Sequence, residues 1–404
     1  MVVWRAVGPP WRGADRCLRP SIRAVNIVSI GGNMTDPRHR KLASALIHYA
    51  LGVRPDDRLL IVTGSLATPL LREVYREALH AEAFPEVRIE IEELATLALR
   101  EGNDAQLRRV SPARLWEAEN YDVLLRIGAA ENTMALSGIA PERLASMQQG
   151  RAALSQRMMA RAASGELRHT GTLFPTQAYA QQAGMPLADY EDFVYGACLP
   201  DRDDPAAAWQ ALSDEWQRIT DFLATRDEIH IVAPGTDLTY RVGGRTWINS
   251  SGSNATGSRN FPSGEVYTGP HERSANGTVR FTYPAVYMGN IVEDVRLTFE
   301  DGRVVAATAA RGQALLEATL DTDEGARRLG EVAFGLNETI SRFTSNILFD
   351  EKIGGTMHLA LGQSYPNSGG VNRSAIHWDL ICDLREGEVY ADGERCYAGG
   401  RFTI

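Results

Sequence analysis

The chain has 404 residues, of which 44% are hydrophobic, and its formal net charge is -9. This length and composition allow two globular domains with hydrophobic cores, and they exclude disorder as the main state. The acidic balance argues against a nucleic-acid partner, because neutralising a phosphate backbone requires a basic face.

Residues 1–33 differ from the rest of the chain and form an N-terminal extension. They contain a single acid, Asp15, and show little hydrophobic periodicity. Two interpretations stay open: a targeting segment, or a translation start assigned too far upstream of Met34, which we favour. The basic character of the segment comes from five arginines: Arg5, Arg12, Arg16, Arg19 and Arg23.

The sequence pattern predicts that residues 34–226 form an α/β domain with a mostly parallel sheet and covering helices. The pattern predicts helices over residues 36–51 and 66–83, and strands over residues 58–63, 86–91 and 121–127. Such alternation of helices and short apolar strands is typical of a parallel sheet that is covered on both faces. Residues 138–225 are rich in Ala, Gln, Arg, Leu and Met, and we expect helices there.

The sequence pattern predicts that residues 227–404 form an α+β domain with an antiparallel sheet. This domain contains the candidate metal site. Apolar and polar residues alternate over 228–232, 238–242, 278–282 and 292–299, between Gly- and Asn-rich turns. Asp301-Gly302 predicts a two-residue hairpin turn of type I′, because both central residues of that turn need a positive φ.

Two segments of this domain combine a packing face with a polar face. In a strand, residues two apart share a face. Ile376, Trp378 and Leu380 therefore point one way, and His377 and Asp379 point the other. Likewise Met357, Leu359 and Leu361 are expected in a core, with His358 beside Ala360 and Gly362 on the opposite face.

Histidine together with carboxylate is the ligand chemistry of Zn, Mn and Co sites. One histidine in a strand is more often a satisfied core or surface residue. Two such strands favour a metal site. Glu265 and Glu331 each follow a glycine, where the backbone can turn sharply. Taken singly, Glu265 could equally be an exposed turn carboxylate, and Glu331 could form an ion pair with Arg327 or Arg328.

Other features narrow the class of protein. The four cysteines, Cys17, Cys198, Cys382 and Cys396, contain no CxxC pair, and we expect a reducing, cytoplasmic compartment. No apolar run approaches the ~18 residues of a membrane-spanning helix. The sequence contains no Gly-x-Ser-x-Gly elbow, no HExxH pair and no phosphate-binding GxxxxGK loop.

Over most of residues 34–404 the chain resembles the thermophilic aminopeptidase T family, the M29 family of metallopeptidases. The segment between Glu351 and His358 is longer than is usual in the family, through Gly354-Gly355. The motifs that carry the resemblance are Gly235-Thr-Asp-Leu-Thr239, Gly264-Glu-Val-Tyr-Thr268, Gly277-Thr-Val-Arg-Phe281, Arg327-Arg-Leu-Gly-Glu331, Leu348-Phe-Asp-Glu351, Met357-His-Leu-Ala-Leu-Gly362 and Ala375-Ile-His-Trp-Asp379.

The resemblance implies a metal-dependent aminopeptidase in which two divalent cations (Zn, Co, Mn or Mg) activate a water against peptides that have a free N-terminus. It also implies a homodimer. Tyr365 corresponds to an active-site tyrosine that stabilises the oxyanion, and Glu351 to a ligand or a base. The implied metal ligands are Glu265, Glu331, His358, His377 and Asp379, with Glu351 as the further candidate.

Two alternatives stay open at this stage. A ring-cleaving non-haem iron dioxygenase on a similar scaffold would keep His358, His377 and Asp379 around one ferrous ion, and would need neither Glu265 nor Glu331. A non-catalytic binding protein is the third reading. Closed structural zinc sites prefer cysteine, and no cysteine lies in the candidate ligand set.

Overall fold

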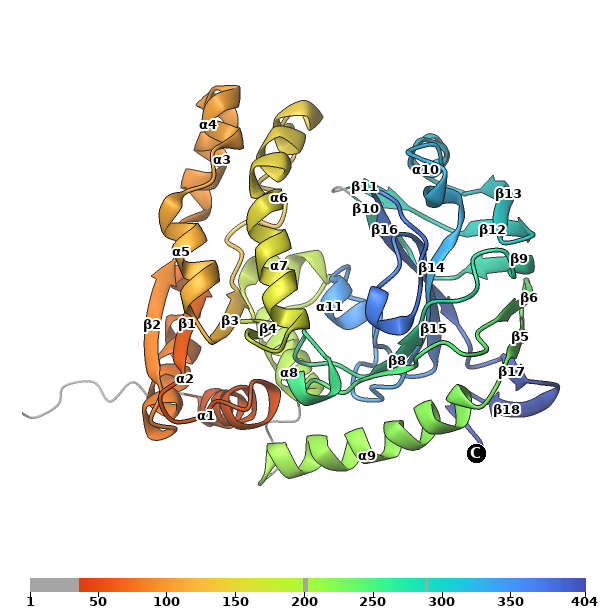
Figure 1. Cartoon of the computed structure of the whole chain (residues 1–404), viewed down its shortest axis with the longest axis horizontal. Helices are drawn as coiled ribbons and strands as arrows, with labels where there is room; N and C mark the ends of the chain where they lie inside the picture. The colour runs from red at the N-terminus through yellow and green to blue at the C-terminus, as the bar shows by residue number, and fades with distance from the viewer. Residues whose placement is uncertain (1–35, 199–202, 288–289) are drawn as a thin grey trace, which may run out of the picture. The chain divides into compact units, whose positions relative to one another are not determined.

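The computed structural model describes residues 36–198, 203–287 and 290–404 (Figure 1). The expected N-terminal extension, residues 1–33, lies outside the described residues. Residues Asp36–Ile404 form one compact unit. The change from parallel to antiparallel strand pairing occurs after residue 173, between the fourth and fifth strands. None of the helices in the described ranges is both long and apolar enough to cross a membrane.

The first part of this unit is a four-stranded sheet in the order β2-β1-β3-β4, and every neighbouring pair is parallel. Its strands are β1 (Arg58–Thr63), β2 (Phe84–Ile89), β3 (Val123–Gly128) and β4 (Arg168–Leu173). The helices of this part are α1 (Pro37–Ser44), continued by a π-helical turn (Ala45–Ala50), α2 (Thr68–His80), α3 (Glu92–Glu101), α4 (Asp104–Arg108), α5 (Pro112–Asn120), α6 (Pro141–Ala163), α7 (Gln177–Gln182), α8 (Leu187–Ala197) and α9 (Pro205–Ala224).

Strand β4 corrects the expectation that residues 138–225 are helical throughout. Its sequence, Arg-His-Thr-Gly-Thr-Leu, lacks the apolar run that marks β1 and β3. Its inward side chains include Thr170 and Thr172, which are buried. A threonine-rich strand between two helices has little hydrophobic pattern. Its extended conformation therefore depends on a tertiary interaction, the pairing with β3.

The second part consists of antiparallel sheets, as expected. An eight-stranded sheet has the order β13-β12-β9-β6-β5-β17-β18-β19, and a five-stranded sheet has the order β16-β15-β14-β8-β7. The first contains β5 (Glu228–Ala233), β6 (Thr236–Arg241), β9 (Asn276–Phe281), β12 (Val295–Glu300), β13 (Arg303–Thr308), β17 (Glu388–Ala391), β18 (Glu394–Ala398) and β19 (Arg401–Phe402). The second contains β7 (Ile248–Ser250), β8 (Glu265–Thr268), β14 (Leu329–Gly335), β15 (Thr356–Gly362) and β16 (His377–Asp383). The hairpin β10 (Ala285–Tyr287) and β11 (Asn290–Val292) and the helices α10 (Gln313–Leu320) and α11 (Ile347–Asp350) complete this part.

Two local predictions have opposite outcomes here. The turn between β12 and β13 is confirmed, because Asp301 has φ 46° and Gly302 has φ 75°, both positive. The single strand expected over residues 292–299 is wrong, because the chain bends at Asp294, where φ is 49°. Strand β11 therefore ends before the bend and β12 begins after it.

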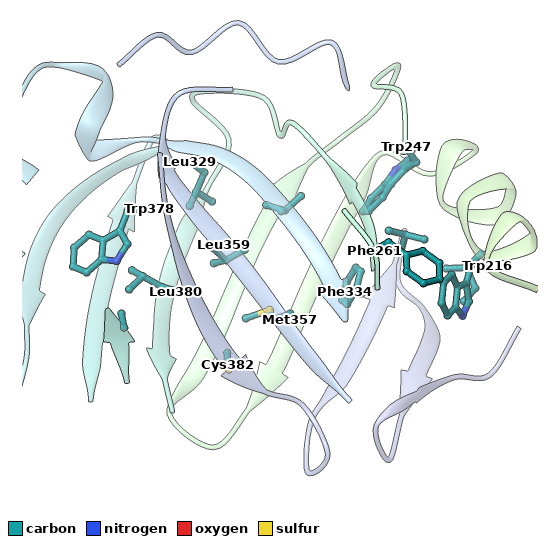
Figure 2. Packing of buried hydrophobic residues seen from close by; sticks show 14 of the residues in the cluster. Trp216, Trp247, Phe261, Leu329, Phe334, Met357, Leu359, Trp378, Leu380 and Cys382 are labelled. Carbon is teal, nitrogen blue, oxygen red and sulfur yellow. The ribbon is translucent and has the colours of Figure 1, made fainter. Parts of the chain in front are cut away.

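The five-stranded sheet packs one face into the main core (Figure 2). Phe334 of β14, Met357 and Leu359 of β15, and Trp378 and Leu380 of β16 all lie on this face and are buried. Aromatic residues of the eight-stranded sheet belong to the same cluster. The face alternation predicted for β15 and β16 is thereby confirmed, and polar residues between these apolar ones must project from the other face.

Candidate metal centre

The polar face of the five-stranded sheet gathers most of the candidate ligands. Directly paired residues of an antiparallel sheet project from the same face. Ala360 of β15 pairs with Glu331 on one side and with Asp379 on the other. His358 and His377 lie two residues from Ala360 and Asp379, so they share that face. Three neighbouring strands therefore present two imidazoles and two carboxylates together.

Glu265 and Glu351 reach the same place from different elements. Glu265 begins β8 and pairs with Gly335, which lies four residues after Glu331 on the same face of β14. Glu351 follows α11 and precedes β15. Its position depends on a loop rather than on the sheet.

The ligand atoms form two groups, in each of which all atoms lie within 4.8 Å of one another. The first group is Glu265, Glu351 and His358. The second is Glu331, His377 and Asp379. We call them the lysine-side group and the aspartate-side group, because Lys352 contacts the first and Asp379 belongs to the second.

Glu331 lies between the two groups. Its Oε1 is 3.4 Å from Nε2 of His358, and its Oε2 is 3.5 Å from Nε2 of His377. His358 Nε2 is also 3.5 Å from Glu265 Oε2, and His377 Nε2 is 3.5 Å from Asp379 Oδ1. Each oxygen of the Glu331 carboxylate thus faces a different histidine.

Hydrogen bonding orients the second histidine. Nδ1 of His377 lies 2.8 Å from the carbonyl oxygen of Gln363, to which a protonated Nδ1 donates. This leaves Nε2 turned toward the carboxylates, which is the usual arrangement when a backbone carbonyl supports a ligating imidazole. Nδ1 of His358 is buried and has no hydrogen-bond partner among the described residues, so its ring contacts carboxylates through Nε2 alone.

Small residues leave room in front of the ligands. Ala360 is completely buried between Glu331 and Asp379. Gly362 has φ 100°, and a Cβ there would lie 2.3 Å from the carbonyl oxygen of Ile376. A larger side chain at either position would fill the space between the carboxylates or displace β16.

The charges of the site favour cations. Burial by itself would lower the pKa of both histidines, but the hydrogen bond to Glu331 and the nearby carboxylates raise the pKa of His358 to about 9. A hydrogen bond and charge from Asp379 likewise raise the pKa of His377 to about 10. Burial raises the pKa of Glu265 and Glu331. A divalent ion would take the place of the protons on the imidazoles, because ligands must be deprotonated to bind.

The site also contains a residue that the sequence did not indicate. Lys352 is completely buried, and its Nζ contacts Glu351 and lies 4.0 Å from Oε1 of Glu265. In a Glu-Lys dipeptide a lysine is normally a surface residue, so no sequence signal could have distinguished it.

Tyr365 lies at the edge of the site. Its ring centroid is 4.9 Å from that of His377 and 5.8 Å from that of Tyr267. The residue keeps 42% of its surface exposed. Burial of the hydroxyl end and the negative charges of Glu331 and Asp379 raise the pKa of Tyr365, so its phenol stays protonated and can donate a hydrogen bond.

An open cavity of about 670 Å³ adjoins the aspartate-side group. His377, Trp378 and Asp379 line one side of it. The rest is lined by residues of α3, α6 and α7, by the segments 130–136, 284–287 and 343–350, and by Ile381, and most of these side chains are apolar. The cavity is large enough for a short peptide.

The donor set fits divalent cations. Two imidazoles and four carboxylates are the ligands that Zn, Co, Mn and Mg use, and no cysteine takes part. The cysteines of the described residues, Cys198, Cys382 and Cys396, are buried free thiols elsewhere. The arrangement can therefore hold divalent metal next to a cleft that is open to a substrate.

Comparisons with known proteins agree with this chemistry. The family model described as thermophilic metalloprotease (M29) matches residues 35–402. The chain is 32% identical over 397 residues to aminopeptidase 2 of Geobacillus stearothermophilus, covering 88% of this chain and 94% of that protein. It is 30% identical over 400 residues to aminopeptidase T of Thermus thermophilus, covering 88% and 95%. The solved structure of wild-type AmpT from Thermus thermophilus matches with a TM-score of 0.77 at 27% identity, covering 91% of this chain and 99% of that one.

Proposed function

The chain belongs to the M29 family of thermophilic metalloproteases and is a metallo-aminopeptidase, and from this premise we propose that it releases N-terminal amino acids from peptides with the help of two divalent cations. The observation that supports a pair of ions is the division of the ligands into two groups with Glu331 between them.

In this proposal the lysine-side group (Glu265, Glu351 and His358) would hold one ion and the aspartate-side group (Glu331, His377 and Asp379) would hold the other. Glu331 could serve both, since its two oxygens face different histidines. Divalent ions in such a site act as Lewis acids and lower the pKa of a bound water toward neutrality.

The chain's own residues would supply the remaining catalytic groups. Tyr365 donates a hydrogen bond to the oxygen that becomes negatively charged when the peptide carbonyl is attacked. Its raised pKa keeps the proton available for that bond. If Glu351 is the base instead of a ligand, it would accept the proton of the attacking water and pass it to the leaving amine.

The exopeptidase character would follow from recognition of the free N-terminus. Its amine would sit on a metal ion or on an acidic group of the site, whereas an acylated N-terminus has no free amine to offer. The cavity beside His377 and Asp379 would then receive the peptide chain.

The dioxygenase alternative lacks support. The similar proteins named above are aminopeptidases. Moreover, Glu265 and Glu331 lie in one site with His358, whereas a single ferrous ion held by two histidines and one aspartate needs neither glutamate.

We further propose, from the family resemblance, that the protein is a cytoplasmic homodimer. Sedimentation equilibrium across a tenfold range of protein concentration tests the dimer: twice the chain mass is the expected result, and a constant single-chain mass contradicts it.

One titration tests the main proposal. The metal-stripped protein is assayed for release of the first residue from leucyl and other aminoacyl amides as Zn, Co, Mn, Mg or ferrous iron is added. We expect activity that saturates near two divalent ions per chain and disappears when the substrate is N-acetylated. Saturation at one ion, or equal activity on the acetylated substrate, would contradict it.

A further inference from the structure

A lysine is buried inside the metal site itself. Lys352 has no exposed surface, and its ammonium group contacts Glu351 and lies 4.0 Å from Glu265. Lysine is almost never fully buried unless it is paired, because removing its charge from water is costly. Both partners belong to the lysine-side group of candidate ligands.

The backbone around Lys352 keeps the ammonium group at this place. Its amide donates to the carbonyl oxygen of Phe349 at 2.9 Å, and its own carbonyl accepts from the amide of Asn337 at 3.1 Å. The side chain of Asn337 donates in turn to the carbonyl of Ser263 at 2.9 Å, two residues before Glu265. The backbone segments that carry Lys352 and Glu265 are thus connected through Asn337.

The aspartate-side group has no such cation. Within the described ranges, the ion-pair partners of Glu331 and Asp379 are His358 and His377, and no lysine or arginine lies within ion-pair distance of either carboxylate. The two groups therefore differ in charge before any metal binds. Lys352 forms a direct ion pair in one group. In the other group the direct partners are imidazoles, and the charge of Lys352 acts on Asp379 only from beyond ion-pair distance.

We propose that Lys352 is a resident cation that competes with the divalent ion for Glu265 and Glu351. It makes the lysine-side position the weaker of the two metal positions and stabilises the carboxylates while that position is empty. The reason is electrostatic: like charges repel strongly at such short range in a buried site, and the lysine already neutralises part of the charge that attracts the ion. Lys352 is thus a positioning residue that sets the order of loading. This inference rests on the proposed two-ion function.

The first test measures metal binding without any assay of activity. Free Mn²⁺ is counted by electron paramagnetic resonance while the wild type and Lys352→Met are titrated. Methionine keeps the length of the side chain and removes the charge. We expect two unequal classes of ion in the wild type, and in the variant a weak class that tightens about tenfold or more while the tight class is unchanged.

The outcomes distinguish the two proposals. A wild type that binds one ion or none contradicts the proposed function. A wild type with two classes, together with a Lys352→Met variant whose weak class is unchanged or in which both classes shift equally, overturns the role of Lys352 alone.

The second test uses thermal unfolding with and without metal. In Lys352→Met, the melting temperature of the metal-free protein should fall more than that of the loaded protein, because only the metal-free state leaves the carboxylates uncompensated. Arg161→Met is the matched control: Arg161 is also buried, and it donates to the backbone carbonyls of Ala118 and Tyr121 in another part of the unit. That variant should lower both melting temperatures equally.

A paired variant keeps the test informative where Lys352→Met does not fold. The Mn²⁺ affinity of Glu351→Gln is compared with that of the double variant Glu351→Gln/Lys352→Met. The single variant lacks one negative charge, and the double variant also lacks the positive charge of the lysine. We expect a tighter weak class in the double variant, since the repelling charge is gone. Equal affinities in the two variants would show that the lysine has only a packing role.

Discussion

Among the individual residues of the site, Glu331 has the most central position. Its two oxygens are 3.4 Å and 3.5 Å from the Nε2 atoms of two different histidines. It is 4% exposed, so these oxygens have few alternative partners in water. A change at this one residue should therefore affect both ligand groups, which is not expected of Glu265 or Asp379.

We expect Glu331→Gln to lose metal and activity together. Glutamine has nearly the same shape but carries an amide and no charge, so it cannot bridge two cations. Metal content after dialysis should fall from two ions to one or fewer, and turnover by ~10²-fold or more. Glu73→Gln is the control, a buried carboxylate that pairs with Arg76 instead. Two ions retained in Glu331→Gln would rule out the bridge.

Tyr365→Phe should keep both ions and lose turnover. Removing one oxyanion hydrogen bond typically costs ~10²- to 10³-fold in kcat. We expect KM and the ion count to stay close to those of the wild type. Tyr267→Phe is the control, because its ring neighbours that of Tyr365 but its hydroxyl lies next to Asn367. If Tyr365→Phe turns over at the wild-type rate, the tyrosine has no oxyanion role.

The free energy of unfolding is expected to depend on pH through His169 of β4. Burial, and then the charge of Arg259, lowers the pKa of His169 to about 4. A histidine whose pKa is depressed on folding contributes full stability above its unfolded pKa of about 6.5 and loses it as the pH falls toward the folded value. We expect wild-type stability to fall by about 1 kcal/mol more than that of His169→Gln between pH 6.5 and 5.5. Urea unfolding in the presence of a chelator measures this difference, and parallel pH profiles would contradict it.

Among the elements, β15 has one face in the core and the other in the candidate metal site. Met357 and Leu359 lie in the core, and His358 and Ala360 lie on the face of the candidate ligands. Its neighbours, β14 and β16, follow the same alternation, so three short strands form both the packed face shown in Figure 2 and the opposite face, which carries the candidate metal ligands. A substitution in β15 should therefore have an effect that depends on its face.

Ala360→Val tests the site face of this strand. Valine is a good strand former, but its two added methyl groups would enter the space between Glu331 and Asp379. We expect loss of metal binding, with a folded protein that is destabilised by about 1–3 kcal/mol. Leu359→Val, one residue away on the core face, should lose about 1 kcal/mol of stability and keep its metal. Equal metal content in the two variants would contradict the assignment of faces.

For the molecule as a whole, the compact unit and the family match begin at almost the same place. The unit starts at Asp36, and the family model matches from residue 35. The parallel sheet and the antiparallel sheets both lie within this unit, and residues from both parts line the cavity beside the candidate metal site.

A chain that begins at Met34 should therefore behave as the full-length chain does. We expect the same melting temperature within about 2 °C, the same ion count and the same turnover, because the ligands and the cavity lie within residues 36–404. A parallel truncation that removes α1 and the π-helical turn after it should unfold, since Leu42 and Leu46 are completely buried. Loss of activity on removing residues 1–33 would show that this segment has a role in the enzyme.

Much of the local structure could be predicted from the sequence because its causes are local. Strand alternation placed His377 and Asp379 opposite Trp378, and the Asp301-Gly302 pair specified its own turn. Strand β4 could not be predicted, because its threonines carry no hydrophobic period and only its neighbour β3 defines it.

The sequence by itself determined which residue types can bind metal and which strand face His358, His377 and Asp379 occupy, because a strand's period of two is a property of the backbone. Only the tertiary structure decided how these residues combine. Glu265 and Glu331 are far apart in the chain, and the irregular register between β14 and β15 at Leu329/Glu331 sets which histidines Glu331 meets. The burial of Lys352 likewise depends on the contact of its loop with Asn337. The neighbouring charges of Glu351 and Lys352 in the sequence do not reveal whether the lysine is exposed to water.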